Sequence, residues 1–278
     1  MHKELLSNAD FNRLRELIYA EVGIHLNADK KTMLETRLRR RLQALDFSSC
    51  AQYCEFVFAA GPRNDEMVHL IDAVTTNKTD FFREAGHFDF LTAKALPSLA
   101  ARHGTNRRSL VWSAGCSTGE EPYTLAMVLS EYAEAAPGFR FNVLGTDICT
   151  TVLERARLGI FKSDGLRPVP AGMRRKYFMR SRDRGSDLMR AVPELRAQIE
   201  FRRLNFMDSD FGINEAPEIV FCRNVIIYFD RETQLRLLQK LARQLAPGGY
   251  FFSGHSESLQ GLDLPFVQAG PSVYRKVS

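Results

Sequence analysis

The sequence predicts an α/β protein in which a doubly wound, Rossmann-like sheet domain follows a small all-helical domain. A buried-strand pattern from Leu110 to Trp112 breaks at a turn of small residues and continues into a helix near Tyr123. A second strand, over residues 140–147, ends in an acid. Helical periodicity fills the first 75 residues and no strand pattern precedes residue 110, so two regions of different class follow one another.

The turn after the first strand and the tip of the second strand are candidates for a ligand site. Residues 115–119 read Gly-Cys-Ser-Thr-Gly, and such a turn lets backbone N–H groups approach a ligand closely. Many α/β proteins use a turn of this kind only to reverse the chain. Asp147, however, ends the second strand, where doubly wound folds bind ribose hydroxyls. Together the two features favour a nucleoside-containing ligand.

Charges beside the turn distinguish between classes of such ligands. The turn lacks the Gly-x-Gly-x-x-Gly of dinucleotide-binding proteins, and Glu120 and Glu121 begin the following helix. Carboxylates at this place would repel a pyrophosphate but would tolerate an ammonium and a sulfonium. We therefore expect S-adenosylmethionine as the ligand, and not NAD.

Composition and charge are those of an ordinary globular protein. The 278 residues carry a formal net charge of +5, which permits an acidic protein, nucleic acid or a membrane surface as partner and selects none. The five cysteines form no Cys-x-x-Cys pair, which indicates reduced thiols in the cytoplasm and no zinc site. Without a leader or a run of about eighteen apolar residues, we expect neither secretion nor membrane insertion.

Residues 1–75 are predicted to form a helical N-terminal domain. The pattern predicts four helices, over residues 11–22, 29–45, 48–60 and 64–74. Asp10 is the expected N-cap of the first. In the second, Arg37, Arg40 and Arg41 project from the side opposite the leucines. This basic side is either a plain solvated face or a substrate-docking surface for something acidic and elongated.

The remaining chain divides into a linker, a sheet domain and an insertion. The linker covers residues 76–86. Its closely spaced polar residues and its two adjacent phenylalanines are unusual for a plain connection and predict that it contributes to the ligand site. The sheet domain covers residues 87–278. Within it, residues 160–198 are basic, interrupted by Pro and Gly, and alternate like a hairpin, which predicts a small antiparallel sheet. The tail, residues 272–277, is expected to add a strand at the sheet edge.

Four motifs resemble the chemotaxis receptor methyltransferase family, CheR. They are Thr-Asn-Lys-Thr-Asp-Phe-Phe-Arg-Glu (76–84), Trp-Ser-Ala-Gly-Cys-Ser-Thr-Gly-Glu-Glu-Pro-Tyr (112–123), Phe-Cys-Arg-Asn-Val-Ile-Ile-Tyr-Phe-Asp (221–230) and Gly-His-Ser-Glu-Ser (254–258). The resemblance implies an S-adenosylmethionine-dependent O-methyltransferase that forms glutamate methyl esters on cytoplasmic helices of chemoreceptors and releases S-adenosylhomocysteine. It also implies a helical domain before a Rossmann-like domain with a β-subdomain. We expect a monomer that needs no metal.

The resemblance also assigns site residues. It implies that the cofactor site is lined by Asn77, Thr79, Arg83, Glu121, Asp147, Asn205, Phe206, Cys222 and Arg223, and the turn after the first strand adds Gly115. Arg83 and Tyr228 are implied to lie nearest the transferred methyl group and are the predicted catalytic residues. Family members that dock on a receptor's C-terminal pentapeptide carry several glycines in the hairpin turn of the β-subdomain. The turn here, residues 181–187, contains Gly185 alone, so we do not expect pentapeptide-dependent docking.

The predicted reaction and its rivals require different residues at the site. A glutamate side chain, with a pKa near ~4.3, is already an ionised nucleophile at neutral pH, so positioning matters and a base does not. Alternatively, Arg83 pairs with a neighbouring acid and Tyr228 packs in the core.

One rival function, nucleic-acid methylation, usually requires the motif Asp/Asn-Pro-Pro-Tyr/Phe at the place that residues 222–228 occupy here. The other, a non-catalytic module that binds the cofactor, would not need Arg83 and Tyr228.

Overall fold

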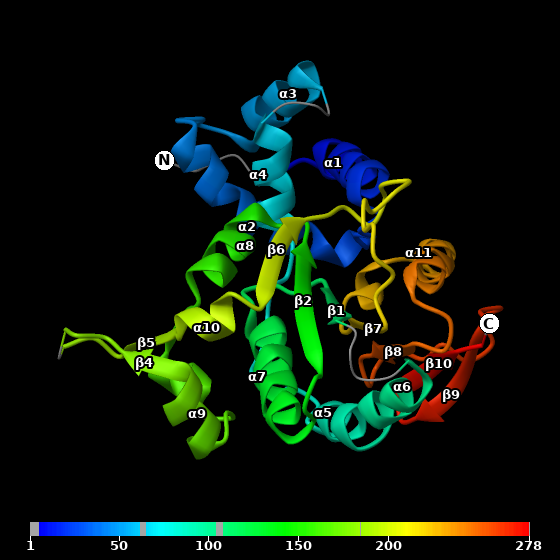
Figure 1. Cartoon of the computed structure of the whole chain (residues 1–278). Helices are drawn as coiled ribbons and strands as arrows, with labels where there is room; N and C mark the ends of the chain where they lie inside the picture. Colours follow the sequence, from blue (N-terminus) through cyan, green and yellow to red (C-terminus); the bar gives the residue numbers. More distant parts are fainter. Residues whose placement is uncertain (1–5, 62–64, 104–107, 184, 278) are drawn as a thin grey trace.

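The computed structural model describes residues 6–61, 65–103, 108–183 and 185–277. A helical region comes first and a seven-stranded sheet with helices on both faces follows, as predicted (Figure 1). Residues 1–5, Asn64 and Arg184, which belong to predicted elements, lie outside the described residues. None of the helices in the described ranges is long and apolar enough to span a membrane.

The helical region contains the four predicted helices. They are α1 (Asn8–Val22), α2 (Lys31–Ala44), α3 (Cys50–Ala60) and α4 (Asp65–Val74), with a short turn of 3₁₀ helix, η1 (Ala28–Lys30), before α2. The predicted cap of α1 was wrong by three residues: Ser7 is the N-cap, and its side chain accepts a hydrogen bond from the backbone N–H of Asp10. Leu14, Leu34 and Leu38 are fully buried in a core that these helices share.

The sheet has the order β6-β2-β1-β7-β8-β10-β9. Its strands are β1 (Arg108–Ala114), β2 (Arg140–Asp147), β6 (Ile199–Arg203), β7 (Ile219–Cys222), β8 (Tyr250–Ser253), β9 (Phe266–Gly270) and β10 (Val273–Lys276). The first five in this order run parallel, and β10 is antiparallel to both neighbours. The tail strand therefore lies inside the sheet, and the expectation that it forms the edge was wrong, because β9 pairs outside it.

Helices cover both faces of this sheet. They are α5 (Gly86–Phe90), η2 (Leu91–Ala95), α6 (Leu96–His103), α7 (Glu120–Ala135), α8 (Thr150–Leu158) and α11 (Arg231–Gln244), with the short 3₁₀ helix η4 (Ile226–Tyr228) after β7. Side chains alternate along β1, so that Val111 packs in the core beneath α7 while Trp112 packs in the core beneath α11. The strand order reverses at β1, which places a ligand crevice at the carboxyl ends of β1 and its neighbours.

The predicted insertion is a small antiparallel sheet of order β3-β5-β4 that projects from the main sheet (Figure 1). It consists of β3 (Ile160–Lys162), η3 (Ser163–Leu166), α9 (Ala171–Tyr177), β4 (Phe178–Arg180), β5 (Leu188–Ala191) and α10 (Pro193–Arg196). Phe81 of the linker packs edge-on against Phe161 and Phe178, with ring centroids 4.8 and 5.8 Å away. One phenylalanine of the linker therefore anchors the insertion.

The helical region is fastened over the carboxyl ends of β2 and β6 (Figure 1). Asp72 of α4 accepts four hydrogen bonds from the N–H and hydroxyl groups of Thr150 and Thr151, at the start of α8. The backbone N–H of His25 donates to the Tyr228 carbonyl at 2.9 Å. These bonds close the ligand crevice with residues from the N-terminal helices.

Candidate active site

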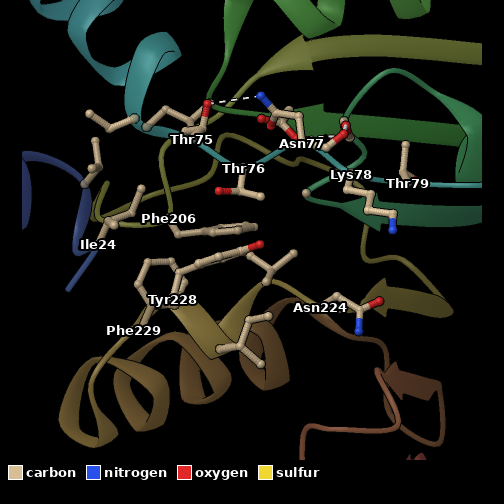
Figure 2. Close-up of a pocket in the computed structure, with 18 of the residues that line it drawn as sticks. Ile24, Thr75, Thr76, Asn77, Lys78, Thr79, Phe206, Asn224, Tyr228 and Phe229 are labelled. Carbon is tan, nitrogen blue, oxygen red and sulfur yellow. Dashed lines mark hydrogen bonds between the residues drawn. The ribbon is translucent and has the colours of Figure 1, made fainter. Parts of the chain in front are cut away.

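A cavity of about 570 Å³ lies at the carboxyl edge of the sheet, a size typical of small-molecule sites. Its walls come from the end of α1 and the segment after it, the linker, the turn after β1, the end of β2, and the loops after β6 and β7. Figure 2 shows linker residues on one side, with Phe206, Tyr228 and Phe229 facing them across the cavity.

The turn after β1 shapes the cavity wall. Gly115 has φ +85°, and a Cβ there would lie 2.4 Å from a methyl group of Val225, so only glycine fits. The N–H groups of Gly115 and Cys116 bond to the Thr146 carbonyl, and that of Ser117 bonds to Asp147. The protein itself therefore uses these three N–H groups, and they are not available to a ligand.

Asp147 lies at the end of β2, as its place in the sequence predicted. Its carboxylate accepts hydrogen bonds from the N–H of Ser117 at 2.8 Å and of Cys149 at 3.0 Å, and it lines the cavity. Burial raises the pKa of Asp147, although these N–H donors act in the opposite direction. An acceptor fixed here by two backbone groups suits a ribose hydroxyl.

Glu121 and Arg223 form a buried ion pair at the cavity wall. Arg223 Nε donates to Glu121 Oε2 at 2.7 Å, and the Ser113 hydroxyl donates to Oε1 at 2.6 Å. Arg223 also donates to the Arg83 carbonyl at 2.6 Å, so it joins β7 to the linker. Glu120, by contrast, accepts from the Thr118 hydroxyl and does not line the cavity. Of the two acids that were expected beside the ligand, only Glu121 therefore lines the cavity.

The two predicted catalytic residues reach the cavity from opposite walls. Arg83 donates to the Lys78 carbonyl at 3.2 Å and pairs with no acid among the described residues, unlike in the alternative interpretation. Tyr228 is half-buried, and its hydroxyl has no hydrogen-bond partner in the described part of the chain. In Figure 2 this hydroxyl points toward the end of the cavity where Lys78 and Asn224 lie.

Most of the other predicted cofactor residues also line the cavity: Asn77, Thr79, Asn205 and Phe206. The Asn205 amide additionally donates to the Glu21 carbonyl at 2.7 Å. Cys222 is the exception. It is fully buried in the core beneath α11 and does not line the cavity, where the resemblance had placed it.

The predicted docking arginines have different environments. Arg37 donates to the carbonyls of Val74 and Thr75, and Arg41 forms a bidentate pair with the buried Glu66. These contacts hold α2 against α4 and the segment that leads into the linker. Arg40 is exposed and keeps its charge available for a partner.

Several lining residues were missed from the sequence. His25, Lys30 and Met33 reach the cavity because the N-terminal helices cover it, and no periodicity signals that placement. Lys78 stands between the chosen residues Asn77 and Thr79, and only the fold shows that it lines the cavity as well.

A group of potential metal ligands lies behind Arg223. Side-chain atoms of Glu84, His87 and His255 come within 4.8 Å of one another. Arg223 Nη1, however, donates to His87 Nδ1 at 3.0 Å. Burial and this neighbouring charge lower the pKa of His87 to about 4, and the same charge would oppose a cation.

The sheet order, the acid at the end of β2 and the cavity at the carboxyl edge define a Rossmann-like fold that binds a nucleoside-containing ligand at this edge. Residues 9–75 match the all-alpha domain of the CheR methyltransferases, and residues 77–274 match their SAM-binding domain. The chain therefore belongs to the CheR methyltransferase family, as the four motifs predicted.

Curated relatives match over nearly their whole length. Each of the following is named a chemotaxis protein methyltransferase. The relative from Salmonella typhimurium is 40% identical over 97% of this chain and 90% of its own. That from Escherichia coli is 39% identical over 97% and 91%, and that from Borreliella burgdorferi is 37% identical over 98% and 95%.

Proposed function

We propose that the protein transfers a methyl group from S-adenosylmethionine to glutamate side chains on the cytoplasmic helices of chemoreceptors, in the cytoplasm, as a monomer. The observation that carries the proposal is the cavity itself. It brings together Asp147, suited to a ribose, Arg83, which pairs with no acid among the described residues, and Tyr228, whose hydroxyl has no partner among them. Family membership and the names of the relatives support the same activity.

The residues present fit the cofactor. When bound, S-adenosylmethionine supplies a methyl group on a positively charged sulfur. Asp147 would accept hydrogen bonds from its ribose, and the paired Glu121 and Arg223 would present a wall without net charge. The aromatic rings of Phe206 and Tyr228 supply apolar surface that excludes water (Figure 2). The cavity thus offers both the polar anchor and the dry space that the transfer needs.

The acceptor needs orientation and no deprotonation. A glutamate carboxylate, with a pKa near ~4.3, is ionised at neutral pH and attacks directly. Arg83 would draw it to the mouth of the cavity and the Tyr228 hydroxyl would orient it, an entropic effect that can supply roughly 7–11 kcal/mol. The exposed Arg40 would steer acidic receptor helices, and pentapeptide binding by the insertion would not be needed.

A transfer assay tests the proposal. The full chain is incubated with S-adenosylmethionine labelled in the methyl group and with receptor cytoplasmic fragments that lack the C-terminal pentapeptide, or with RNA. We expect label on the receptor fragments that mild base releases, as it does for an ester. Label on RNA, base-stable label, or binding of S-adenosylhomocysteine without any transfer would each refute the proposed function.

A further inference from the structure

The loop after β7 contains an asparagine in an unusual backbone conformation. Asn224 has φ +58°, in the left-handed region that few residues other than glycine adopt. It lines the cavity directly after Arg223 and is half-buried. Asparagine tolerates this conformation better than most residues, and here the surrounding structure fixes it.

A buried carboxylate enforces this conformation. Glu257 is 3% exposed, and its Oε2 accepts from the N–H of Asn224 at 2.8 Å and of Gly254 at 2.7 Å. Its Oε1 accepts from the next two N–H groups, those of Val225 and Ile226, at 2.8 and 3.0 Å. Four N–H donors on one side chain fix the whole turn that leads to Tyr228.

The amide of Asn224 is itself free. Among the residues that the structure describes, this amide has no hydrogen-bond partner, although the backbone N–H of the same residue donates to Glu257. A Cβ at position 254 would lie 2.7 Å from Asn224 Nδ2, so Gly254 leaves the room that this amide occupies. Figure 2 shows Asn224 at the end of the cavity toward which the Tyr228 hydroxyl points.

We propose that Asn224 is a substrate-positioning residue, whose amide donates a hydrogen bond to the acceptor carboxylate and which Glu257 holds in place. The inference rests on the proposed function, because it assigns the carboxylate that this function methylates. A neutral amide adds a hydrogen bond of fixed direction to the attraction that Arg83 supplies, without placing a second cation on the attacking oxygen.

Three substitutions separate this role from a purely conformational one. Glycine adopts φ +58° without strain, and aspartate tolerates it about as well as asparagine, whereas alanine does not. If Asn224 served only the backbone, Asn224→Gly and Asn224→Asp would therefore keep more activity than Asn224→Ala. Positioning of a carboxylate predicts the opposite for aspartate, whose charge repels the acceptor.

The experiment measures kcat and KM with receptor fragments and, by calorimetry, the affinity for S-adenosylhomocysteine. We expect Asn224→Gly and Asn224→Ala to lose about 10–100-fold in kcat/KM. Asn224→Asp should lose more than either, with the affinity for S-adenosylhomocysteine unchanged in all three. Asn214→Ala, at an exposed asparagine outside the cavity, is the control and should match the wild type.

Two results would overturn the inference while leaving the proposed function intact: wild-type kcat/KM in Asn224→Gly, or higher activity in Asn224→Asp than in Asn224→Ala. A wild-type protein that binds S-adenosylhomocysteine but methylates no receptor fragment would instead refute the proposed function, and this inference with it.

Discussion

Arg223 Nε donates to Glu121 Oε2 across 2.7 Å, and this ion pair joins the start of α7 to the end of β7 at the wall of the cavity. Both side chains are at least nine-tenths buried. A buried charge that loses its partner is costly, so the two residues act as one unit in stability as well as in binding.

The first prediction concerns this pair. Arg223→Ala should lower the free energy of unfolding by about 3–5 kcal/mol, because Glu121 is left buried and unpaired. Adding Glu121→Ala should cost less than the sum of the single changes. The free energies of unfolding of the single and double variants can be measured by denaturation, followed by the fluorescence of Trp112, which is the only tryptophan in the sequence and is fully buried. Strictly additive losses would show that the two charges do not interact.

The second prediction separates docking from folding on α2. Arg40→Glu should raise KM for receptor fragments at low salt, and less so at high salt, without loss of stability. Arg41→Met should instead lower the free energy of unfolding by about 3–5 kcal/mol, because Glu66 loses its partner. Arg243→Glu, an equal charge change on the exposed side of α11, is the control. Equal KM values for the two charge reversals would argue against docking on α2.

The third prediction concerns pH and the contact between α4 and α8. Burial would raise the pKa of Asp72, but the hydrogen bonds from Thr151 and Thr150 outweigh it and hold the pKa below its ordinary value. The folded state is therefore stabilised above the unfolded pKa, near ~3.9, and loses this contribution as the pH falls through the folded value. Asp72→Asn should cost about 1–3 kcal/mol at pH 7.

Unfolding curves of the wild type and Asp72→Asn, measured between pH 7 and the acid range, check this. The difference between the two proteins should shrink below about pH 4. A difference that stays constant over this range would mean that the Asp72 charge is not what fastens α8.

The fourth prediction concerns the turn after β1. Gly115→Ala places a methyl group against Val225 and strains a residue at φ +85°, so the turn or Val225, which both line the cavity, must move. We expect at least a ~10-fold loss of affinity for S-adenosylhomocysteine, since such strain is worth 1–3 kcal/mol. Gly165→Ala, where a Cβ has open space, is the matched control. Unchanged affinity in Gly115→Ala would contradict the tight approach of these loops.

Strand ends were predictable from the sequence, and partners across domains were not. Asp147 and Arg223 follow buried strands, and the rules for parallel sheets fix where such residues meet. Arg41 looked like a free surface charge because its partner Glu66 lies on another helix, 25 positions away. Periodicity places a residue on a face of its own helix but does not say which element covers that face.

Two further differences have local causes. Cys222 was assigned from the resemblance, and it ends a strand buried on both faces, where alternation does not say which side chain turns toward the cavity. The edge strand β9 went unpredicted because most of its residues are exposed and it carries no alternating apolar pattern.

Calorimetric titration of the protein with S-adenosylhomocysteine tests the central claim most directly, namely that the cavity at the carboxyl edge of the sheet holds the methyl donor. We predict saturable heat with one site per chain, and affinity at least ~10-fold weaker in Asp147→Ala, which loses the ribose acceptor. Absence of heat with the wild-type protein, or equal affinity in the two proteins, would contradict it.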